Sequence, residues 1–270
     1  MKKIIVDFLE WLEDTLKRPL LILKIFHLNR TIRKGNFFDF PIYIISFNRL
    51  SFLKQTVEWL QKYGYKNIVI IDNNSNYPPL LEYLDNCGCK VYRMKKNYGH
   101  RVFFKHPKFL LKRNLSFFAL TDPDLEPVKD CPQDFIEQFF KVFQKYPYYS
   151  KIGFSLKIDD IPDSYYLKNE VIALEKKYYE KELKTNGSYR LYEANLDTTF
   201  SVFSPMIYTS NKKWYYAVRV GLPYQLRHLP WYGEDDSEEL RHYKASVRKD
   251  VSNWNGNVSK DLIRERYNLK

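Results

Sequence analysis

Short apolar strands alternate with helical patterns between residues 41 and 158, and this alternation constrains the fold more than any other feature of the sequence. The strand segments are continuous apolar runs, typical of strands covered on both faces in a parallel sheet. Strands are predicted at 41–46, 67–72, 90–93, 115–121 and 152–158, and helices at 50–63, 78–86, 107–113 and 133–144. The predicted class is α/β, with a mostly parallel central sheet and flanking helices.

The second half of the chain is less regular. Residues 172–184 have a charged helical pattern that predicts a helix or a lid. Strands are predicted at 190–194, 198–203 and 217–220, and a helix at 236–243. The last thirty residues hold eight Lys and Arg without strong periodicity, which predicts a basic tail that covers the sheet or lies on an acidic surface.

Composition limits the class of protein and of partner. The 44% of hydrophobic residues is enough for a sizeable core, so a folded chain is expected rather than an intrinsically disordered one. Three cysteines cannot form a disulfide framework, which favours a reducing compartment. The net charge of +12, with its clearest clusters near the termini, leaves nucleic acid, an anionic membrane face or a phosphate-bearing substrate as partners.

The N-terminal segment has the pattern of an amphipathic helix that ends at Lys17-Arg18-Pro19. Two interpretations stay open, a helix packed on the main domain and a peripheral membrane attachment helped by Lys24 and Arg30 beside Phe26. Acidic residues interrupt the region where a signal peptide would need its apolar core, so secretion is not expected. We expect a cytoplasmic protein, and the second interpretation places it at the inner face of the membrane.

Polar residues follow four of the predicted strands, at the points where the strands end. Ligands of open α/β sheets bind at these carboxyl ends. An acid just past a buried strand can accept a hydrogen bond from a base or a ribose. Two acids with one residue between them can share Mn²⁺ or Mg²⁺ with a diphosphate, because these ions prefer oxygen ligands. The four segments are Ser46-Phe47-Asn48-Arg49, Asp72-Asn73-Asn74-Ser75, Asn97-Tyr98-Gly99-His100-Arg101 and Asp122-Pro123-Asp124.

In their order and spacing, these segments resemble the GT-A glycosyltransferases, particularly the family-2-like enzymes that use nucleotide sugars. They are similar to that family's (T/S)-(Y/F)-N-R turn, its D-(N/D)-x-S segment, its N-x-G loop and its DxD metal motif. The resemblance covers roughly residues 40–158, under half of the chain. It implies a Rossmann-like GT-A fold, Mn²⁺ or Mg²⁺ as the cofactor, and a nucleotide-diphosphate sugar, expected to be a UDP-sugar, as the donor.

The resemblance also implies roles for individual residues. Asp122 and Asp124 would hold the metal ion together with His228. Arg219 and Arg227 would neutralise the leaving diphosphate. The nucleotide sugar would be bound by these two arginines and by Ser46, Asn48, Arg49, Asp72, Asn73, Asn97 and Asp122. The alternatives are that Asp72 and Asp122 cap turns or helices and that Asn97-Tyr98-Gly99 is a plain turn.

The general base is predicted in either of two segments. An inverting enzyme needs a carboxylate to deprotonate the acceptor as it attacks. One segment, Trp231-Tyr232-Gly233-Glu234-Asp235-Asp236, resembles the acidic segment of inverting GT-A enzymes and offers Asp235 or Asp236, with N-capping as the alternative role. The other offers Asp197, an isolated acid entering an apolar strand. Trp214, Trp231 and Tyr232 have flat faces for an acceptor sugar.

The predicted organisation has four parts. They are an amphipathic and basic helical segment (1–39), a nucleotide-sugar-binding α/β half (40–160), an acceptor-binding and catalytic half (161–245) and a basic tail (246–270). The leading hypothesis is a metal-dependent, hexosyltransferase-like enzyme that extends a glycan or lipid-linked saccharide in surface polysaccharide or lipopolysaccharide biosynthesis, without a nucleic-acid partner. The alternatives are a basic nucleic-acid-binding protein and a nucleotidyltransferase, although Phe47-Asn48-Arg49-Leu50 lacks the glycine-rich phosphate loop of the latter.

Overall fold

A computed structural model describes residues 2–196, 199–209, 215–233, 236–247 and 259–268, with only the helical backbone described for residues 2–15 and 17. The helices are α1 (Lys2–Lys34), α2 (Leu50–Lys62), α3 (Pro78–Asn86), α4 (Val102–Lys105), α5 (Leu110–Leu115), α6 (Phe135–Lys145), α7 (Lys168–Lys176), α8 (Glu238–Ser246) and α9 (Lys260–Tyr267), with short 3₁₀ turns that include η4 (Met206–Tyr208). The strands are β1 (Ile42–Ser46), β2 (Ile68–Asp72), β3 (Lys90–Arg93), β4 (Phe118–Thr121), β5 (Leu125–Pro127), β6 (Lys151–Leu156), β7 (Glu182–Leu183), β8 (Leu191–Glu193), β9 (Ser201–Phe203) and β10 (Ala217–His228).

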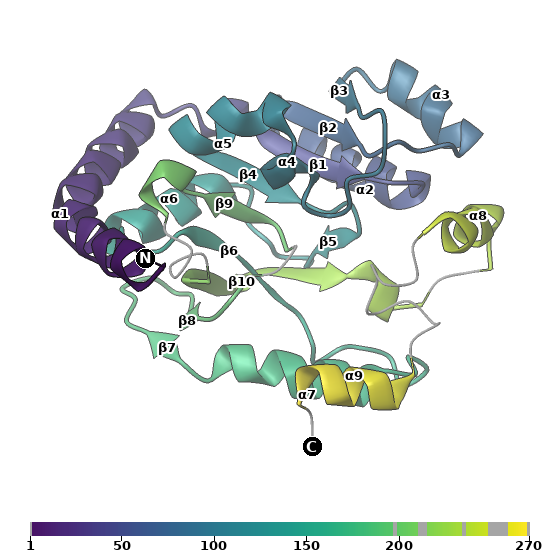
Figure 1. Ribbon diagram of the computed structural model, residues 1–270. Helices are drawn as coiled ribbons and strands as arrows, with labels where there is room; N and C mark the ends of the chain where they lie inside the picture. The colour runs from purple at the N-terminus through teal and green to yellow at the C-terminus, as the bar shows by residue number, and fades with distance from the viewer. Residues whose placement is uncertain (1, 197–198, 210–214, 234–235, 248–258, 269–270) are drawn as a thin grey trace.

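Within the described residues, ten strands form one sheet in the order β3-β2-β1-β4-β9-β6-β10-β8-β7, with β5 paired to β10 (Figure 1). The strands β3, β2, β1 and β4 are parallel, and so are β6 and β10. The α/β class with a parallel central sheet and flanking helices is therefore confirmed. β9 runs antiparallel between β4 and β6, and strands from both predicted halves of the chain thus lie side by side in one sheet. The division into two functional halves stays a prediction.

The continuous apolar strands are buried on both faces, as the sequence predicts. In β1, Ile42 and Ile44 belong to the larger core, which packs against α2 and α6. Their neighbours Tyr43 and Ile45 belong to a second core, which packs against α4 and Phe109. Because successive residues of a strand point to opposite faces, each face needs its own apolar layer.

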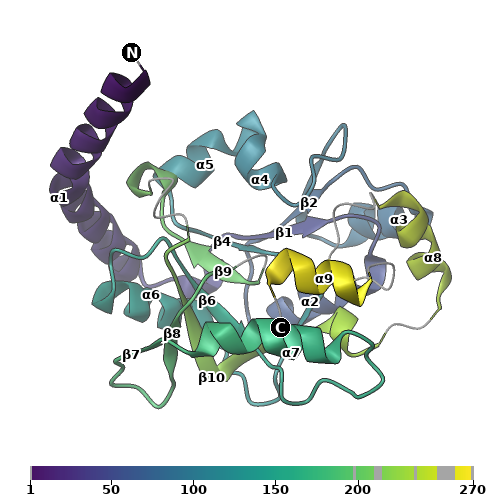
Figure 2. The same ribbon diagram turned by 60° about the horizontal axis from the view of Figure 1, so that its bottom comes forward.

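Helix α1 continues through Pro19 to Lys34, whereas the sequence predicted its end at Pro19. Proline removes one helical hydrogen bond, but contacts of the second half of the helix with the domain compensate for this loss. Lys24 is buried and donates to the backbone oxygen of Tyr149, and the ring of His27 meets Phe117 edge-on. Figure 2 shows the C-terminal part of α1 beside α6, whereas the N-terminal end of the helix extends away from the rest of the domain.

The last described segment is helical, although no periodicity predicted a helix there. Helix α9 packs against α7, with Ile263 fully buried between them. Arg264 donates to the buried carboxylate of Glu170 in α7 at 2.8 Å. The end of the tail therefore covers α7 rather than the sheet (Figures 1 and 2). Among the described residues, no helix has the length and apolar content needed to cross a membrane.

Candidate active site

The turn after β1 is tied to the turn after β2 through Asn48. Asn48 is fully buried and has a φ of 49°, in the left-handed region that asparagine tolerates better than most residues. Its Oδ1 accepts from the backbone nitrogens of Asn76 and Tyr77, and its Nδ2 donates to Asn76 and to Ser246 of α8. The side chain predicted to bind the nucleotide is thus committed to partners within the protein.

The turn after β2 is tied to the loop after β3 in the same way. Asn73 is buried, and its Nδ2 donates to the side-chain oxygen of Asn97 at 2.8 Å and to the backbone oxygen of Gly99 at 3.0 Å. Its Oδ1 accepts from the backbone nitrogen of Tyr98. Gly99 has a φ of 72°, which favours glycine. Two sequence segments that are 24 residues apart therefore form one rigid unit beside the ends of β2 and β3.

Ser46 and Asp72 lie side by side at the ends of β1 and β2. Asp72 is nearly inaccessible, and its Oδ1 accepts from the backbone nitrogen of Ser75 at 3.1 Å. This contact is the turn-capping role that the sequence left open, and it uses one carboxylate oxygen. The hydroxyl of Ser46 is buried and makes no hydrogen bond within the described residues. Polar groups that remain without partners at a sheet edge suit a site that a ligand completes.

Asp124 and His228 face each other at the start of β5 and the end of β10. Their Oδ2 and Nε2 atoms are 3.4 Å apart, and Leu229 donates its backbone N–H to the carbonyl of Asp124. Burial alone raises the pKa of the Asp124 carboxyl, but His228 and Arg49 outweigh it and hold this pKa below its usual range. Asp124 is therefore an ionised carboxylate at neutral pH.

Asp124 and His228 offer two protein ligands to a divalent cation. No group of three or more His, Cys, Asp or Glu side chains gathers as a metal site in the part of the chain that the structure describes. Mg²⁺ is commonly held by one or two carboxylates plus substrate phosphates, and an imidazole suits Mn²⁺, so the pair fits a cation shared with a bound diphosphate. The Nδ1 of His228 is buried without a hydrogen-bond partner among the described residues, which leaves it available to a water or a ligand.

Arg49 and Glu239 join the strand-end edge to α8. Glu239 is buried and accepts from the backbone nitrogen and the hydroxyl of Ser51 at the start of α2. It lies 3.5 Å from Nε of Arg49, whose guanidinium also packs on the rings of Phe52 and Tyr243. No sequence pattern singled out Glu239 as a site residue. In the sequence, Glu239 is only the second of two glutamates in the first turn of a helix, and this pattern does not indicate a buried carboxylate.

Replacing Glu239 by glutamine is expected to lower the free energy of unfolding by about 1.5–3 kcal/mol, because charged groups form the stronger hydrogen bonds. The change removes the charge that pairs with Arg49 and weakens the bonds to Ser51. Urea denaturation measures the effect. The matched control is Glu238→Gln on the same helix, which should change little because Glu238 is exposed. Equal effects of the two substitutions would contradict the anchoring role of Glu239.

A cavity of about 550 Å³ lies at the ends of β1 and β4, on the side covered by α4. One wall is apolar and includes Phe104, Phe203 and Met206, and Asp122 lies at its polar side. The basic residues lining it are His100, Arg101 and Lys151, and Asp122 is the one acid among its described lining residues. Lys151 is buried and donates to the backbone oxygen of Leu196 at 2.6 Å. The positive lining suits an anionic ligand.

The structure does not bring Arg219 to this site. Arg219 is almost fully buried and donates to Glu175 of α7 at 2.6 Å and to the backbone oxygen of Asn195 at 2.9 Å. Its guanidinium also stacks on the ring of Tyr178. A guanidinium with these partners supports the loop at Asn195, which lines the cavity, rather than reaching a diphosphate itself.

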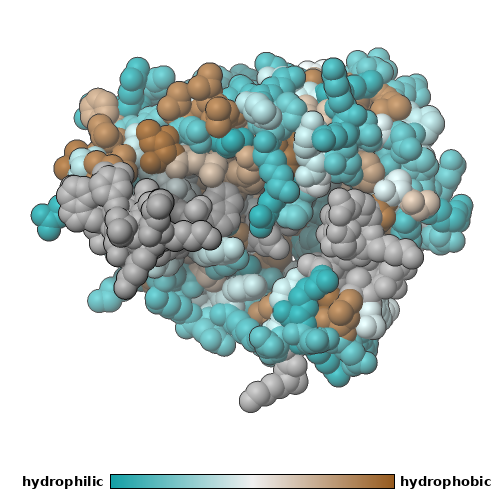
Figure 3. Space-filling model, viewed as in Figure 1, coloured by the Kyte–Doolittle hydropathy of each residue, from teal (hydrophilic) through white to brown (hydrophobic). Residues whose placement is uncertain are grey.

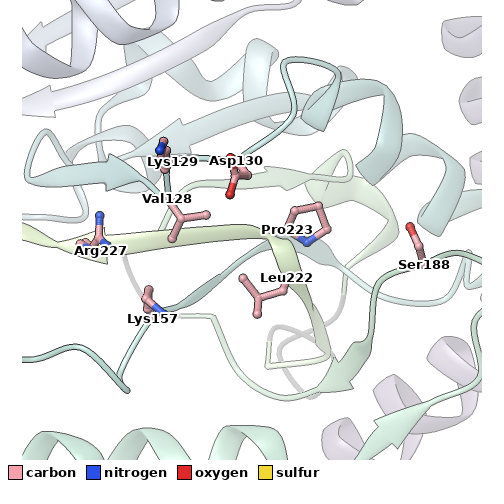
Figure 4. A pocket seen from close by; sticks show the side chains of 8 residues that line it. All are labelled: Val128, Lys129, Asp130, Lys157, Ser188, Leu222, Pro223 and Arg227. Carbon is pink, nitrogen blue, oxygen red and sulfur yellow. The ribbon is translucent and has the colours of Figure 1, made fainter.

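Arg227 also lies away from Asp124. It follows the strand alternation of β10, so its side chain points to the face opposite that of His228. There it forms an ion pair with Asp160 at 2.6 Å and lines a second pocket of about 450 Å³ with Lys129 and Lys157 (Figure 4). The carboxylate of Glu126 is a second ion-pair partner, at 3.7 Å from the Arg227 guanidinium. The predicted contact of Arg227 with the diphosphate is therefore not supported by its position.

Two of the three predicted acceptor aromatics, Trp231 and Tyr232, contact other residues of the protein. Trp231 is buried, and its ring packs on His228 with centroids 4.8 Å apart. This contact orients the imidazole instead of offering a face to a sugar. The hydroxyl of Tyr232 donates to Asp160. Trp214 lies outside the described residues, whereas its neighbour Tyr215 is exposed and lines the cavity.

Of the three candidate bases, only Asp236 is described. It is 80% exposed and pairs with Arg241, and the N-cap of α8 is Ser237. Helix α8 begins two residues later than the sequence predicted, so Asp236 does not cap it. Asp197 and Asp235 lie outside the described residues.

Three solved structures are similar to the chain at low sequence identity. A mannosyltransferase from Pyrobaculum calidifontis, solved with GDP-Man and Mn²⁺, has a TM-score of 0.44 at 9% identity and covers 86% of this chain and 76% of its own. TarS from S. aureus has a TM-score of 0.42 at 11% identity, over 70% of this chain and 36% of its own. A UDP-glucose pyrophosphorylase complexed with UDP-glucose has a TM-score of 0.36 at 11% identity, and the match covers 63% of this chain and 78% of its own. No protein-family model and no curated protein sequence matches the chain. At these values the three likenesses assign neither a family nor an activity.

Proposed function

We propose that this protein is a metal-dependent glycosyltransferase that moves a sugar from a nucleoside-diphosphate sugar to a glycan or lipid-linked saccharide. One observation carries the proposal. At the end of the central strand β4, Asp122 faces a cavity lined by basic side chains, and two residues later Asp124 faces His228. A divalent cation next to an anion-binding cavity is the arrangement that a departing diphosphate requires.

In this proposal, Asp124 and His228 hold Mn²⁺ or Mg²⁺. When bound, the cation supplies positive charge that stabilises the diphosphate as it leaves. Arg49 lies on the Asp124 side of the site, and its charge keeps that carboxyl ionised. Trp231 fixes the ring of His228 by packing against it. Asp122, the second acid of the motif, is proposed as a further metal or ribose contact from the cavity side.

The nucleoside is proposed to bind at the ends of β1 and β2, where Asp72 and Ser46 offer polar atoms to the base and ribose. Asn48, Asn73 and Asn97 act differently from the roles the resemblance implied. Their side chains hold the surrounding loops in place, which positions the donor site without touching the nucleotide. Arg101 and Lys151 are proposed to replace Arg219 and Arg227 as the cations nearest the transferred group.

The proposal extends to the donor, the stereochemistry and the general base. The donor is proposed to be a UDP-sugar, the reaction inverting, and the base Asp197 or Asp235, because Asp236 is exposed and paired with Arg241. We place the enzyme in surface polysaccharide or lipopolysaccharide biosynthesis, in the cytoplasm and at the inner face of a membrane.

The proposal is tested with purified protein, a panel of UDP-, GDP- and TDP-sugars, and Mn²⁺ or Mg²⁺. We expect one donor to be hydrolysed slowly to its nucleoside diphosphate, with the activity lost in EDTA and restored by either metal, because the metal ion supplies most of the charge that stabilises the leaving diphosphate. Chromatography of the released nucleotide measures the rate. Neither hydrolysis nor nucleoside-diphosphate binding with any donor would contradict the proposal. Release of pyrophosphate from UTP and a sugar phosphate would indicate a nucleotidyltransferase instead.

A further inference from the structure

Exposed apolar side chains gather on three elements that lie next to one another. Helix α1 exposes Ile22, Leu23 and Phe26, and Phe26 has 68% of its surface exposed. Helix α5 exposes Leu110, Leu111 and Leu115, of which Leu111 is 71% exposed, and η4 exposes Ile207. η4 contacts both α1 and α5, which makes the surface continuous. Figure 3 shows the brown apolar atoms over these elements, at the upper left, interleaved with hydrophilic ones. We call this surface the α1–η4–α5 face.

The three sequence stretches that contain the exposed apolar residues of this face carry only positive charge. Residues 86–121, which include α4 and α5, contain nine Lys and Arg and no Asp or Glu. Residues 15–38, in and after α1, contain six Lys and Arg and again no acid, and residues 198–233 around η4 are also free of acids. The largest basic stretch is therefore internal, although the clearest clusters of charge were expected near the termini. Exposed Lys108 and Lys112 stand beside the leucines of α5.

The apolar face continues into the cavity at Asp122. Within η4, Ile207 belongs to the exposed face and the preceding Met206 lines the cavity. Phe104 of α4 and Phe203 of β9 pack on each other at 5.6 Å between ring centroids and form part of the same apolar wall. One wall of the cavity therefore lies beside the exposed face.

We propose that the α1–η4–α5 face binds an anionic lipid bilayer and so holds the mouth of the Asp122 cavity at the membrane surface. Apolar side chains enter the boundary between headgroups and acyl chains, and the surrounding lysines and arginines meet the anionic headgroups. This inference rests on the proposed function, which makes the cavity part of the active site. If the cavity lies at the membrane surface, the acceptor comes from the bilayer and is lipid-linked.

Two other occupants fit the face less well. Two copies of the chain joined through it would bring these three acid-free, basic stretches together, which like-charge repulsion disfavours. A single-stranded nucleic acid would need aromatic rings for stacking, whereas the exposed residues of this face are mainly leucine and isoleucine. The pairing of aliphatic and cationic side chains favours lipid.

The test is flotation of the full chain with vesicles of phosphatidylcholine alone or mixed with phosphatidylglycerol. We expect binding to the anionic vesicles, and a loss of about tenfold or more in Phe26→Glu/Leu111→Glu, because charges replace the inserted side chains. Leu262→Glu is the matched control, since Leu262 is an exposed leucine on α9 and should bind as wild type does. The proposal would be overturned if the full chain did not bind anionic vesicles, or if Leu262→Glu lost as much binding as Phe26→Glu/Leu111→Glu. It would also be overturned if the protein formed a dimer that Leu111→Glu dissociates.

A second measurement locates the cavity mouth. Tryptophan fluorescence from Ile207→Trp should gain quenching by lipids spin-labelled near the headgroup, relative to wild type, whereas Leu262→Trp should gain none. The reverse pattern would place the membrane on another face.

Donor hydrolysis without vesicles separates this inference from the proposed function. Leu111→Glu should hydrolyse the donor at the wild-type rate, because Leu111 is on the outer surface. Hydrolysis without vesicle binding contradicts the docking alone. Vesicle binding without hydrolysis leaves the docking supported and contradicts the proposed function.

Discussion

Replacing Asp124 by alanine is expected to lower metal-dependent release of nucleoside diphosphate by a factor of about 10²–10³, the usual effect of removing one electrostatic group that stabilises a transition state. Asp124 is the ionised carboxylate of the proposed cation site, and His228, 3.4 Å away, is its partner. Initial rates at saturating Mn²⁺ measure the effect. Titration with the nucleoside diphosphate should show that Mn²⁺ no longer strengthens its binding.

The matched control for this substitution is Asp159→Asn. Asp159 is 73% exposed and pairs with Lys157 at the surface, so the rate should stay at the wild-type value. His228→Ala should also lower the rate, and the double variant should be little worse than Asp124→Ala, because effects of residues that act as one unit are not additive. An Asp124→Ala protein that keeps both its rate and its Mn²⁺-dependent binding would exclude the cation site proposed here.

Replacing Glu175 by glutamine is expected to lower the free energy of unfolding by about 3–5 kcal/mol, the cost of leaving a buried charge without its partner. The side chains of Arg219 and Glu175 are only 2% and 8% exposed, and they are 2.6 Å apart. Chemical denaturation followed by circular dichroism measures the loss. The second expected effect is reduced activity per folded molecule, because Arg219 also holds the Asn195 loop that lines the cavity.

Two further variants test the physical cause. Replacing both partners, as Arg219→Met with Glu175→Leu, should recover most of the stability, because apolar residues of similar volume remove the unpaired charge. Glu137→Gln should change the stability by only about 0.3–0.5 kcal/mol, because its pair with Lys141 lies on an exposed helix surface. If Glu175→Gln unfolded at the same denaturant concentration as Glu137→Gln, the buried pair would have no structural role.

The sequence predicted local structure well where one pattern dictates it. The apolar runs of β1, β2 and β4 predicted strands buried on both faces, and the two separate cores around Ile44 and Tyr43 confirm that prediction. Leu115 shows where this reasoning fails, because it was assigned to a strand but ends helix α5 with its side chain exposed. An apolar residue on an outer face has the same local pattern as one in a core, so the pattern could not distinguish them.

Pairing between distant strands was outside the reach of local patterns. A strand was predicted at 198–203, yet nothing near it indicated that β9 inserts antiparallel between β4 and β6. That position depends on which sheet edge is open after the rest of the chain has packed. The same limit applies to Glu239, which is defined by its contacts with Ser51 and Arg49, nearly 190 residues away in the chain.

The sequence alone determined the α/β class and the polar residues at the strand ends, because strand length and apolar content are local properties. Only the tertiary structure decided what each of those side chains does. The side chains of Asn48 and Asn73 form hydrogen bonds that join neighbouring loops. Arg227 and His228 are adjacent in β10, and their side chains point to opposite faces of the sheet. Trp231 is buried against His228 because it lies in the 3₁₀ turn that directly follows β10. Burial and hydrogen bonding of a side chain depend on neighbours distant in sequence, and these neighbours bring together Asp124 and His228, the pair that we propose to hold a cation.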